Sequence, residues 1–166
     1  MGHLIKKLTY FLFTITILAS NDRVSANEYQ FIGKFLLEYS IFKIDVYEIS
    51  YYKSPNGSEK LLLDYQMDVK KKYSQQGWTV GLKFKTIIPK YKTKAQWLLD
   101  NTIDLLKGDK LSIIKNKFKV TLLKNDKLVA TIIDPIIAEL AFEPWLGTNP
   151  VSLELKNSLL GLNKEK

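Results

Sequence analysis

The sequence predicts an α+β domain in which helices cover one face of a large, mostly antiparallel sheet. Residues 29–52 are rich in β-branched and aromatic types, and residues 61–70 alternate between apolar and mostly polar side chains. Such alternation is typical of a half-buried strand. Residues 93–107 repeat leucines at helical spacing, and residues 111–133 return to strand-like alternation. Strands on both sides of a helical middle are typical of the α+β class.

The first 26 residues have the three-part pattern of a secretory signal. Lys6 and Lys7 begin it, and residues 8–18 form an uncharged, mostly apolar run of 11 residues. A membrane span needs about 20 apolar residues, so this run is short for one. Val24-Ser25-Ala26 supplies the small residues that a signal peptidase accepts. We therefore expect cleavage after Ala26, and the alternative is an N-terminal anchor that stays uncut.

The predicted folded part is residues 27–166, whose length suits a single domain. Cleavage would remove His3, the only histidine, and Arg23, the only arginine, and the chain has no cysteine. A Ser-His-Asp triad, a thiol nucleophile and an ordinary zinc site would then all be impossible. We predict no metal and no cofactor, and favour a non-catalytic role. The predicted compartment is the periplasm, with the outside medium as the alternative.

Turn signals divide the first half of this domain into hairpins. The parity of the apolar side chains switches between Val46 and Tyr47, which indicates a β-bulge or a change of sheet face. Residues 54–57 read Ser-Pro-Asn-Gly, a strong turn signal because proline fixes φ and Asn-Gly tolerates positive φ. The alternating segment 61–70 then supplies the next strand.

Two helices are expected in the middle of the domain. Ser74 is placed to cap a helix that runs to about Ile88, where Pro89 ends it. Thr93 opens a second helix that continues to Lys107, and Gly108 follows it as a C-terminal glycine would.

The last third returns to strands and then ends in helices. The expected strands are residues 111–115, 118–124 and 128–133. Asn125-Asp126 forms the hairpin turn between the last two. Asp134-Pro135 is an N-cap followed by proline at the first helical position, so a helix is expected over residues 136–142. A final amphipathic helix begins at Pro150 and is ended by Gly161.

Several short blocks occur in the order and spacing of one known family: Val46–Tyr52, Leu61–Tyr65, Gly108–Leu111, Asn125-Asp126, Asp134-Pro135 and Trp145–Pro150. The block Trp145–Pro150, which reads WLGTNP, is the most specific of them. In these blocks, which extend over most of residues 30–161, the chain resembles the bacterial exported chalcone isomerase-like proteins. The resemblance implies a large antiparallel sheet, a layer of helices on one face, and a cleft between the two layers.

The resemblance also implies a choice of functions. Plant enzymes of this fold close a flavanone ring with an arginine and Tyr or Thr hydroxyls, and related members bind fatty acids in the same cleft. The family usually carries an arginine in its first strand pair. Here that stretch is Gly33–Tyr39, GKFLLEY, which has none. Lysine offers a point charge and not a bidentate fork, so the departure argues against both the cyclase activity and the usual grip on a carboxylate.

Four residues are candidates for ligand binding. The resemblance places Tyr47 and Tyr51 along the cleft, where their hydroxyls could bond a head group, and the alternative is ordinary packing against helices. Lys34 is the cation nearest to the missing arginine, and the alternative is a solvated strand residue. Trp97 is the remaining candidate, although its apolar neighbours favour a place in the core.

The leading hypothesis is an exported, non-catalytic domain that binds a small apolar or amphipathic molecule, such as a fatty acid, between sheet and helices. One alternative is an isomerase or lyase acting on a carbonyl substrate with Tyr and Lys groups. Another is a structural or partner-binding envelope protein. Nucleic acid is not expected, because arginine is missing from the domain. The lysine clusters at 70–72 and 90–94 could give weak association with an anionic membrane surface, although solubility is the commoner explanation.

Overall fold

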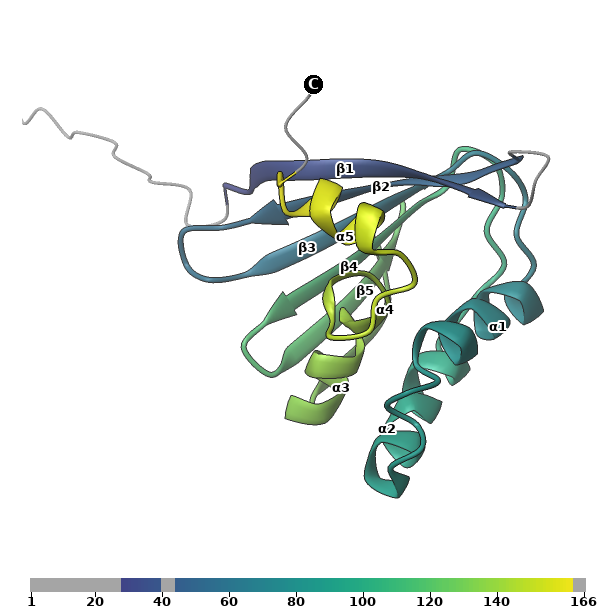
Figure 1. Ribbon diagram of the computed structural model, residues 1–166, viewed down its shortest axis with the longest axis vertical. Coiled ribbons are helices and arrows are strands. Elements are labelled where there is room, and N and C mark those ends of the chain that lie inside the picture. Colours follow the sequence, from purple (N-terminus) through teal and green to yellow (C-terminus); the bar gives the residue numbers. More distant parts are fainter. Residues whose placement is uncertain (1–27, 40–43, 163–166) are drawn as a thin grey trace, which may run out of the picture.

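The computed structural model describes residues 28–39 and 44–162 (Figure 1). The predicted signal peptide and its cleavage site lie outside the described residues. Six strands form one sheet in the order β1 to β6, and every neighbouring pair is antiparallel. The strands are β1 (Gln30–Tyr39), β2 (Ile44–Lys53), β3 (Glu59–Tyr65), β4 (Lys110–Asn116), β5 (Lys119–Lys124) and β6 (Lys127–Ile133). The helices are α1 (Lys71–Gly81), α2 (Pro89–Asp100), α3 (Pro135–Leu140), α4 (Glu143–Leu146) and α5 (Leu153–Leu159).

The helices cover one face of the sheet, as the sequence predicts (Figure 1). The side chains that point to this face from the central strands are fully buried and include Ile49, Leu61, Leu63 and Ile113. They pack in one core with buried residues of the helices, among them Leu140, Leu155 and Leu159. Full burial of each such side chain contributes roughly 1.5–3 kcal/mol, so the core between the layers is the main source of stability.

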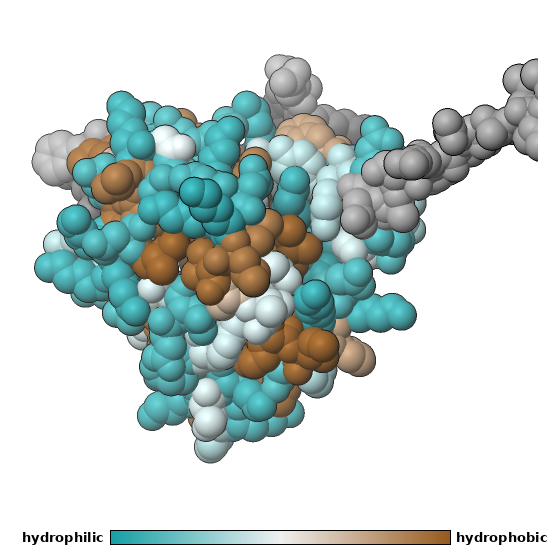
Figure 2. Space-filling model, turned by 180° about the vertical axis from the view of Figure 1, so that it is seen from behind, coloured by the Kyte–Doolittle hydropathy of each residue, from teal (hydrophilic) through white to brown (hydrophobic). Residues whose placement is uncertain are grey.

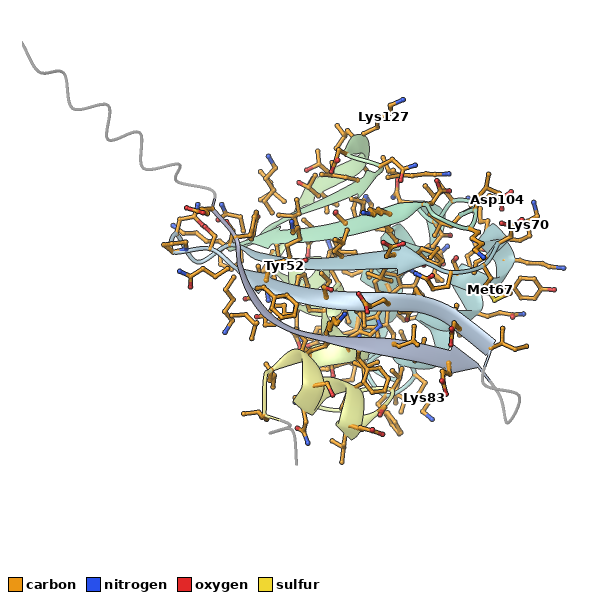
Figure 3. All side chains as sticks on the ribbon, turned by 90° about the horizontal axis from the view of Figure 1, so that it is seen from above. Tyr52, Met67, Lys70, Lys83, Asp104 and Lys127 are labelled. Carbon is orange, nitrogen blue, oxygen red and sulfur yellow. The ribbon has the colours of Figure 1, made fainter. Side chains whose placement is uncertain are left out.

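None of the helices in the described part of the chain lies on the opposite face of the sheet (Figure 1). Figure 3 looks onto this face, where Tyr52 lies. Figure 2, which views the molecule from behind, shows hydrophobic groups between hydrophilic ones. Among the described residues, no helix has the length and apolar character that crossing a membrane requires.

The predicted bulge is confirmed in β2. Leu37 pairs with Tyr47, and the next residue of β1, Glu38, pairs with Asp45, so Val46 is the extra residue. The bulge moves Tyr47 onto the helix-covered face, in line with Ile49. The predicted turns are confirmed as well. Gly57 has φ +82°, and Asn125 and Asp126 both have positive φ, as a tight two-residue hairpin turn requires.

The predicted ends of the two middle helices are wrong. The first helix starts at Lys71 and not at Ser74, because Asp104 Oδ1 accepts a hydrogen bond of 2.7 Å from the Lys71 amide and caps the helix from a distant loop. It ends at Gly81 and not near Ile88. Pro89 begins the next helix, where a fixed φ and a missing N–H are both tolerated.

That second helix ends at Asp100 instead of Lys107. Leu105 pairs with Val69 through two backbone hydrogen bonds of 2.7 and 2.9 Å. This pairing holds residues 101–107 in a non-helical path. By contrast, the local cap at Asp134 is confirmed: its Oδ1 accepts from the amides of Ile136 and Ile137. The last helix begins at Leu153, three residues after Pro150, because Ser152 caps it.

Candidate functional site

A depression of about 290 Å³ opens where the sheet meets the C-terminal helices. It lies on the helix-covered side, where the family resemblance expects a cleft. Residues of β2, β3 and β4 form one wall, and α3, α4 and the segments around α4 and α5 form the other. The lining residues are Tyr51, Glu59, Lys115, Glu139, Phe142, Glu143, Leu146, Gly147 and Leu160.

On the sheet side, three polar groups form a connected chain. The Tyr51 hydroxyl donates a hydrogen bond of 2.7 Å to Glu59, and Lys115 lies 3.1 Å from the other oxygen of the same carboxylate. Glu59 and Lys115 are paired residues of β3 and β4, so the strand register holds this ion pair in place. Burial, and then the nearby Glu59 carboxylate, raise the pKa of Tyr51 far above its usual value. Tyr51 is therefore a hydrogen-bond donor at any physiological pH.

On the helix side, a buried carboxylate is held by the middle of the Trp145–Pro150 block. Glu143 is only 4% exposed, and its Oε1 accepts hydrogen bonds from the amide and the hydroxyl of Thr148, at 3.1 and 3.0 Å. A Cβ on Gly147 would lie 2.2 Å from this carboxylate, so only glycine lets the chain pass so closely. The close approach explains why residue 147 is glycine, and the two hydrogen bonds give Thr148 its role.

The carboxylate of Glu139 is linked to that of Glu143 by a lysine that contacts both. Lys85 Nζ lies 2.6 Å from Glu139 and 3.7 Å from Glu143. The hydrogen bond to Glu139 raises the pKa of Lys85, which therefore stays charged. Tyr91 donates a further hydrogen bond to Glu139. The turn after α1 is thereby tied to α3.

The charge balance of the depression is negative. Three carboxylates line it against a single lysine, Lys115, and Lys85 reaches two of the carboxylates from the rim. Both lysines already have acidic partners. The site therefore offers hydrogen-bond acceptors beside an apolar wall of Phe142, Leu146 and Leu160.

The structure does not bring the four sequence-predicted candidates together. Tyr51 lines the depression. Tyr47 lies on the same face of β2, where its hydroxyl accepts a hydrogen bond of 3.1 Å from the Trp145 indole, and burial raises its pKa to about 12. Lys34 lies on the uncovered face, in an exposed ion pair with Glu48 at 2.9 Å. Trp97 is partly buried in α2, away from the lining.

Sequence reasoning missed the carboxylates. Glu59, Glu139 and Glu143 come from separate segments, and only the fold brings them together. One local signal was available for Glu143, because it is a single charge between apolar residues in Leu140–Trp145, and a charge so placed needs specific partners when buried.

A second depression of about 290 Å³ lies on the uncovered face, lined by Tyr29, Ser58, Ile114, Asn116, Lys119 and Thr121. Beside it, Lys60 Nζ lies 4.7 Å from the centroid of the Tyr29 ring and 4.6 Å from that of Tyr52, labelled in Figure 3. This site lies outside the expected cleft.

No protein-family model and no curated protein sequence matches the chain. Among solved structures, the chain is similar to the crystal structure of a fatty-acid binding protein from Arabidopsis thaliana, with a TM-score of 0.66 at 11% sequence identity. The match covers 81% of this chain and 88% of the Arabidopsis chain. At such low identity the likeness shows the fold alone. The chain has the chalcone isomerase-like α+β fold, with a six-stranded antiparallel sheet and helices on one face.

Proposed function

We propose that the chain is an exported, non-catalytic domain that binds a small amphipathic molecule in the depression between the sheet and the C-terminal helices. The observation that carries the proposal is the mixed lining of the depression. Phe142, Leu146 and Leu160 form an apolar part, whereas Tyr51, Glu59 and Lys115 on the sheet side and two carboxylates on the helix side supply hydrogen-bonding and charged groups. Small-molecule sites usually combine an apolar lining with a few placed polar groups, and about 290 Å³ suits a ligand at the small end of that class.

An apolar tail for the ligand is supported by two observations. The lining of the depression includes the apolar side chains of Phe142, Leu146 and Leu160, and the Arabidopsis protein with the same fold is a fatty-acid binding protein. A fatty acid is therefore the first molecule to test.

The head group of the ligand follows from the charge balance. A carboxylate would enter beside Glu59, Glu139 and Glu143, and neither lysine at the site is free of an acidic partner. Like charges at close range are unfavourable where water is partly excluded. We therefore propose that a neutral or cationic head that donates hydrogen bonds binds more tightly than a free carboxylate.

A non-catalytic role is supported by the chemistry of the lining. A general base works best when its pKa lies near the working pH. The pKa of Tyr51 is raised instead of lowered, and residues 27–166 contain no histidine or cysteine. Export is proposed on the three-part pattern of residues 1–26, and the periplasm remains the proposed compartment.

The test compares amphiphiles that share one tail, each kept below its micelle concentration. Isothermal titration with dodecylamine, monolauroylglycerol and dodecanoate should give binding, with dodecanoate the weakest by about tenfold. The net charge of +8 would attract dodecanoate to the surface at large, so a preference for the amine reports on the depression.

A matched pair of variants locates the binding. Leu160→Trp places a large ring in the depression and should weaken binding about tenfold. Leu153→Trp, on the exposed side of α5, should leave the affinity unchanged. Absence of binding to all three amphiphiles, or equal affinities of the two variants, would contradict the proposal.

A further inference from the structure

A different surface, formed by α1, the turn after it and the start of α2, combines exposed apolar groups with unpaired positive charge. Its apolar part is Val80, Phe84, Ile87 and Ile88, whose side chains are 46 to 76% exposed. Single exposed apolar residues are normal, but four within nine consecutive positions form a patch that calls for a partner. We name these four residues the α1–α2 patch. The two helices that carry it extend past the edge of the sheet (Figure 1).

The segment that carries the patch holds the whole net charge of the chain. From Lys70 to Leu99 there are eight lysines and no aspartate or glutamate. The chain has 25 Lys and Arg against 17 Asp and Glu, so its other residues hold 17 charges of each sign. A strong positive field is therefore centred on α1 and α2.

Four of these eight lysines contact residues outside the segment, three through an acidic side chain and one through a backbone carbonyl. Lys70 pairs with Asp104, as Figure 3 shows, Lys85 pairs with Glu139, and Lys94 pairs with Asp134. Lys71 bonds the carbonyl of Asp100. Within the described part of the chain, no ion pair involves the remaining four, which are Lys72, Lys83, Lys90 and Lys92.

Three of these four lysines lie next to aromatic rings. Lys83 Nζ is 4.8 Å from the centroid of the Phe84 ring, and Lys90 Nζ is 4.9 Å from that of Tyr91. Near the start of α1, Lys72 Nζ is 4.8 Å from the centroid of the Tyr73 ring. In each case the ammonium group lies over a ring, so charged and aromatic groups stand side by side on this surface, as they do at a membrane–water interface.

We propose that the α1–α2 patch docks the domain on the surface of a membrane that contains anionic phospholipid. The apolar side chains would enter the boundary between head groups and acyl chains, and Lys83, Lys90 and Lys92 would meet the lipid phosphates. Interfacial protein segments bind by this combination of apolar burial and attraction to anionic lipid. A second copy of the chain is disfavoured as the occupant, because both copies would bring the same positive field. The proposal is independent of the ligand site.

The test measures binding of the purified chain to vesicles by sedimentation. Vesicles with 30% phosphatidylglycerol should bind the protein, and vesicles of phosphatidylcholine alone should bind it far more weakly. The triple variant Lys83→Gln/Lys90→Gln/Lys92→Gln should lose roughly a hundredfold in affinity, because each lysine near an anionic surface contributes about fivefold, which is ~1 kcal/mol. Phe84→Ser/Ile87→Ser should also weaken binding, at unchanged charge.

The control removes the same charge elsewhere. Lys117, Lys119 and Lys127 are exposed in the β4–β6 hairpins, so their replacement by glutamine should change the affinity by about twofold or less. Three results would overturn the proposal. One is equal loss in the test and control triple variants. Another is binding to neutral and anionic vesicles alike. The third is an absence of binding to anionic vesicles, combined either with binding to an acidic polypeptide or with a dimer that the Phe84→Ser/Ile87→Ser variant does not form.

Discussion

The indole of Trp145 donates a hydrogen bond of 3.1 Å to the hydroxyl of Tyr47, and this bond joins α4 to the second strand of the sheet. The same indole packs edge-on against Trp78, with ring centroids 5.3 Å apart. Trp145 therefore connects three parts of the fold: strand β2, the C-terminal helices and α1.

Tyr47→Phe should destabilise the domain although the aromatic ring stays in the core. The substitution leaves the Trp145 N–H buried without its acceptor, and an unsatisfied buried donor costs about 1–3 kcal/mol. Urea denaturation measures the difference in the free energy of unfolding. Tyr73→Phe, at an exposed position of α1, is the control and should lie within about 0.5 kcal/mol of the parent. Equal stability of the two variants would mean that the Trp145–Tyr47 bond contributes nothing.

Gly147→Ala should disturb the buried Glu143 carboxylate. The added methyl group would lie 2.2 Å from that carboxylate, and overpacking of this kind costs about 1–3 kcal/mol. Gly77→Ala is the matched control, since its Cβ would meet nothing within 4 Å and it lies inside a helix. It should stabilise the domain by about 0.5–1 kcal/mol. Thermal unfolding of both variants tests the pair, and opposite signs are expected.

Acid should destabilise the domain partly through Asp109. Its carboxylate accepts hydrogen bonds from the Leu106 amide, Lys124 and Asn125, which lower the pKa of Asp109 to about 2. The folded state therefore holds its proton less tightly than the unfolded chain. The resulting stability is present above about pH 4 and is lost as the pH falls toward 2.

Asp109→Asn should flatten the decline of the unfolding free energy between pH 5 and pH 2, measured by urea titration at each pH. Asp126→Asn, in the nearby hairpin turn, is the control and should keep the slope of the parent. If the unfolding free energy of Asp109→Asn falls with pH as steeply as that of the parent, Asp109 binds its proton equally well in the folded and the unfolded chain.

Export should remove the first 26 residues. When the full chain is expressed in a bacterial host, the periplasmic fraction should contain a protein whose mass equals that of residues 27–166 and whose N-terminus is Asn27. Ala26→Pro should block the cleavage and leave a longer, membrane-bound form. Recovery of the uncut chain from the cytoplasm would refute the prediction.

Local signals in the sequence predicted the features that depend on neighbouring residues. The bulge at Val46 follows from side-chain parity, and the cap at Asp134 follows from one carboxylate before a proline. The start of α1 could not be predicted in this way, since its cap is Asp104, 33 residues away. The end of α2 likewise depends on the pairing of Leu105 with Val69.

The same distinction applies to the site. Tyr51 could be predicted because the family resemblance aligned its strand with the cleft. Its partners Glu59 and Lys115 become neighbours only through the register of β3 and β4. The charge balance of the depression is thus a property of the assembled sheet and helices, and no single segment shows it.

Methyl chemical shifts of leucine and isoleucine give the most direct test of the proposed ligand site. On titration with dodecylamine, the methyl signals of Leu146 and Leu160 should shift, whereas those of Ile114, on the uncovered face, should not. Shifts confined to Ile114 would move the site to the other side of the sheet. No shift of any of these signals at saturating amphiphile would contradict a ligand-binding role for the depression.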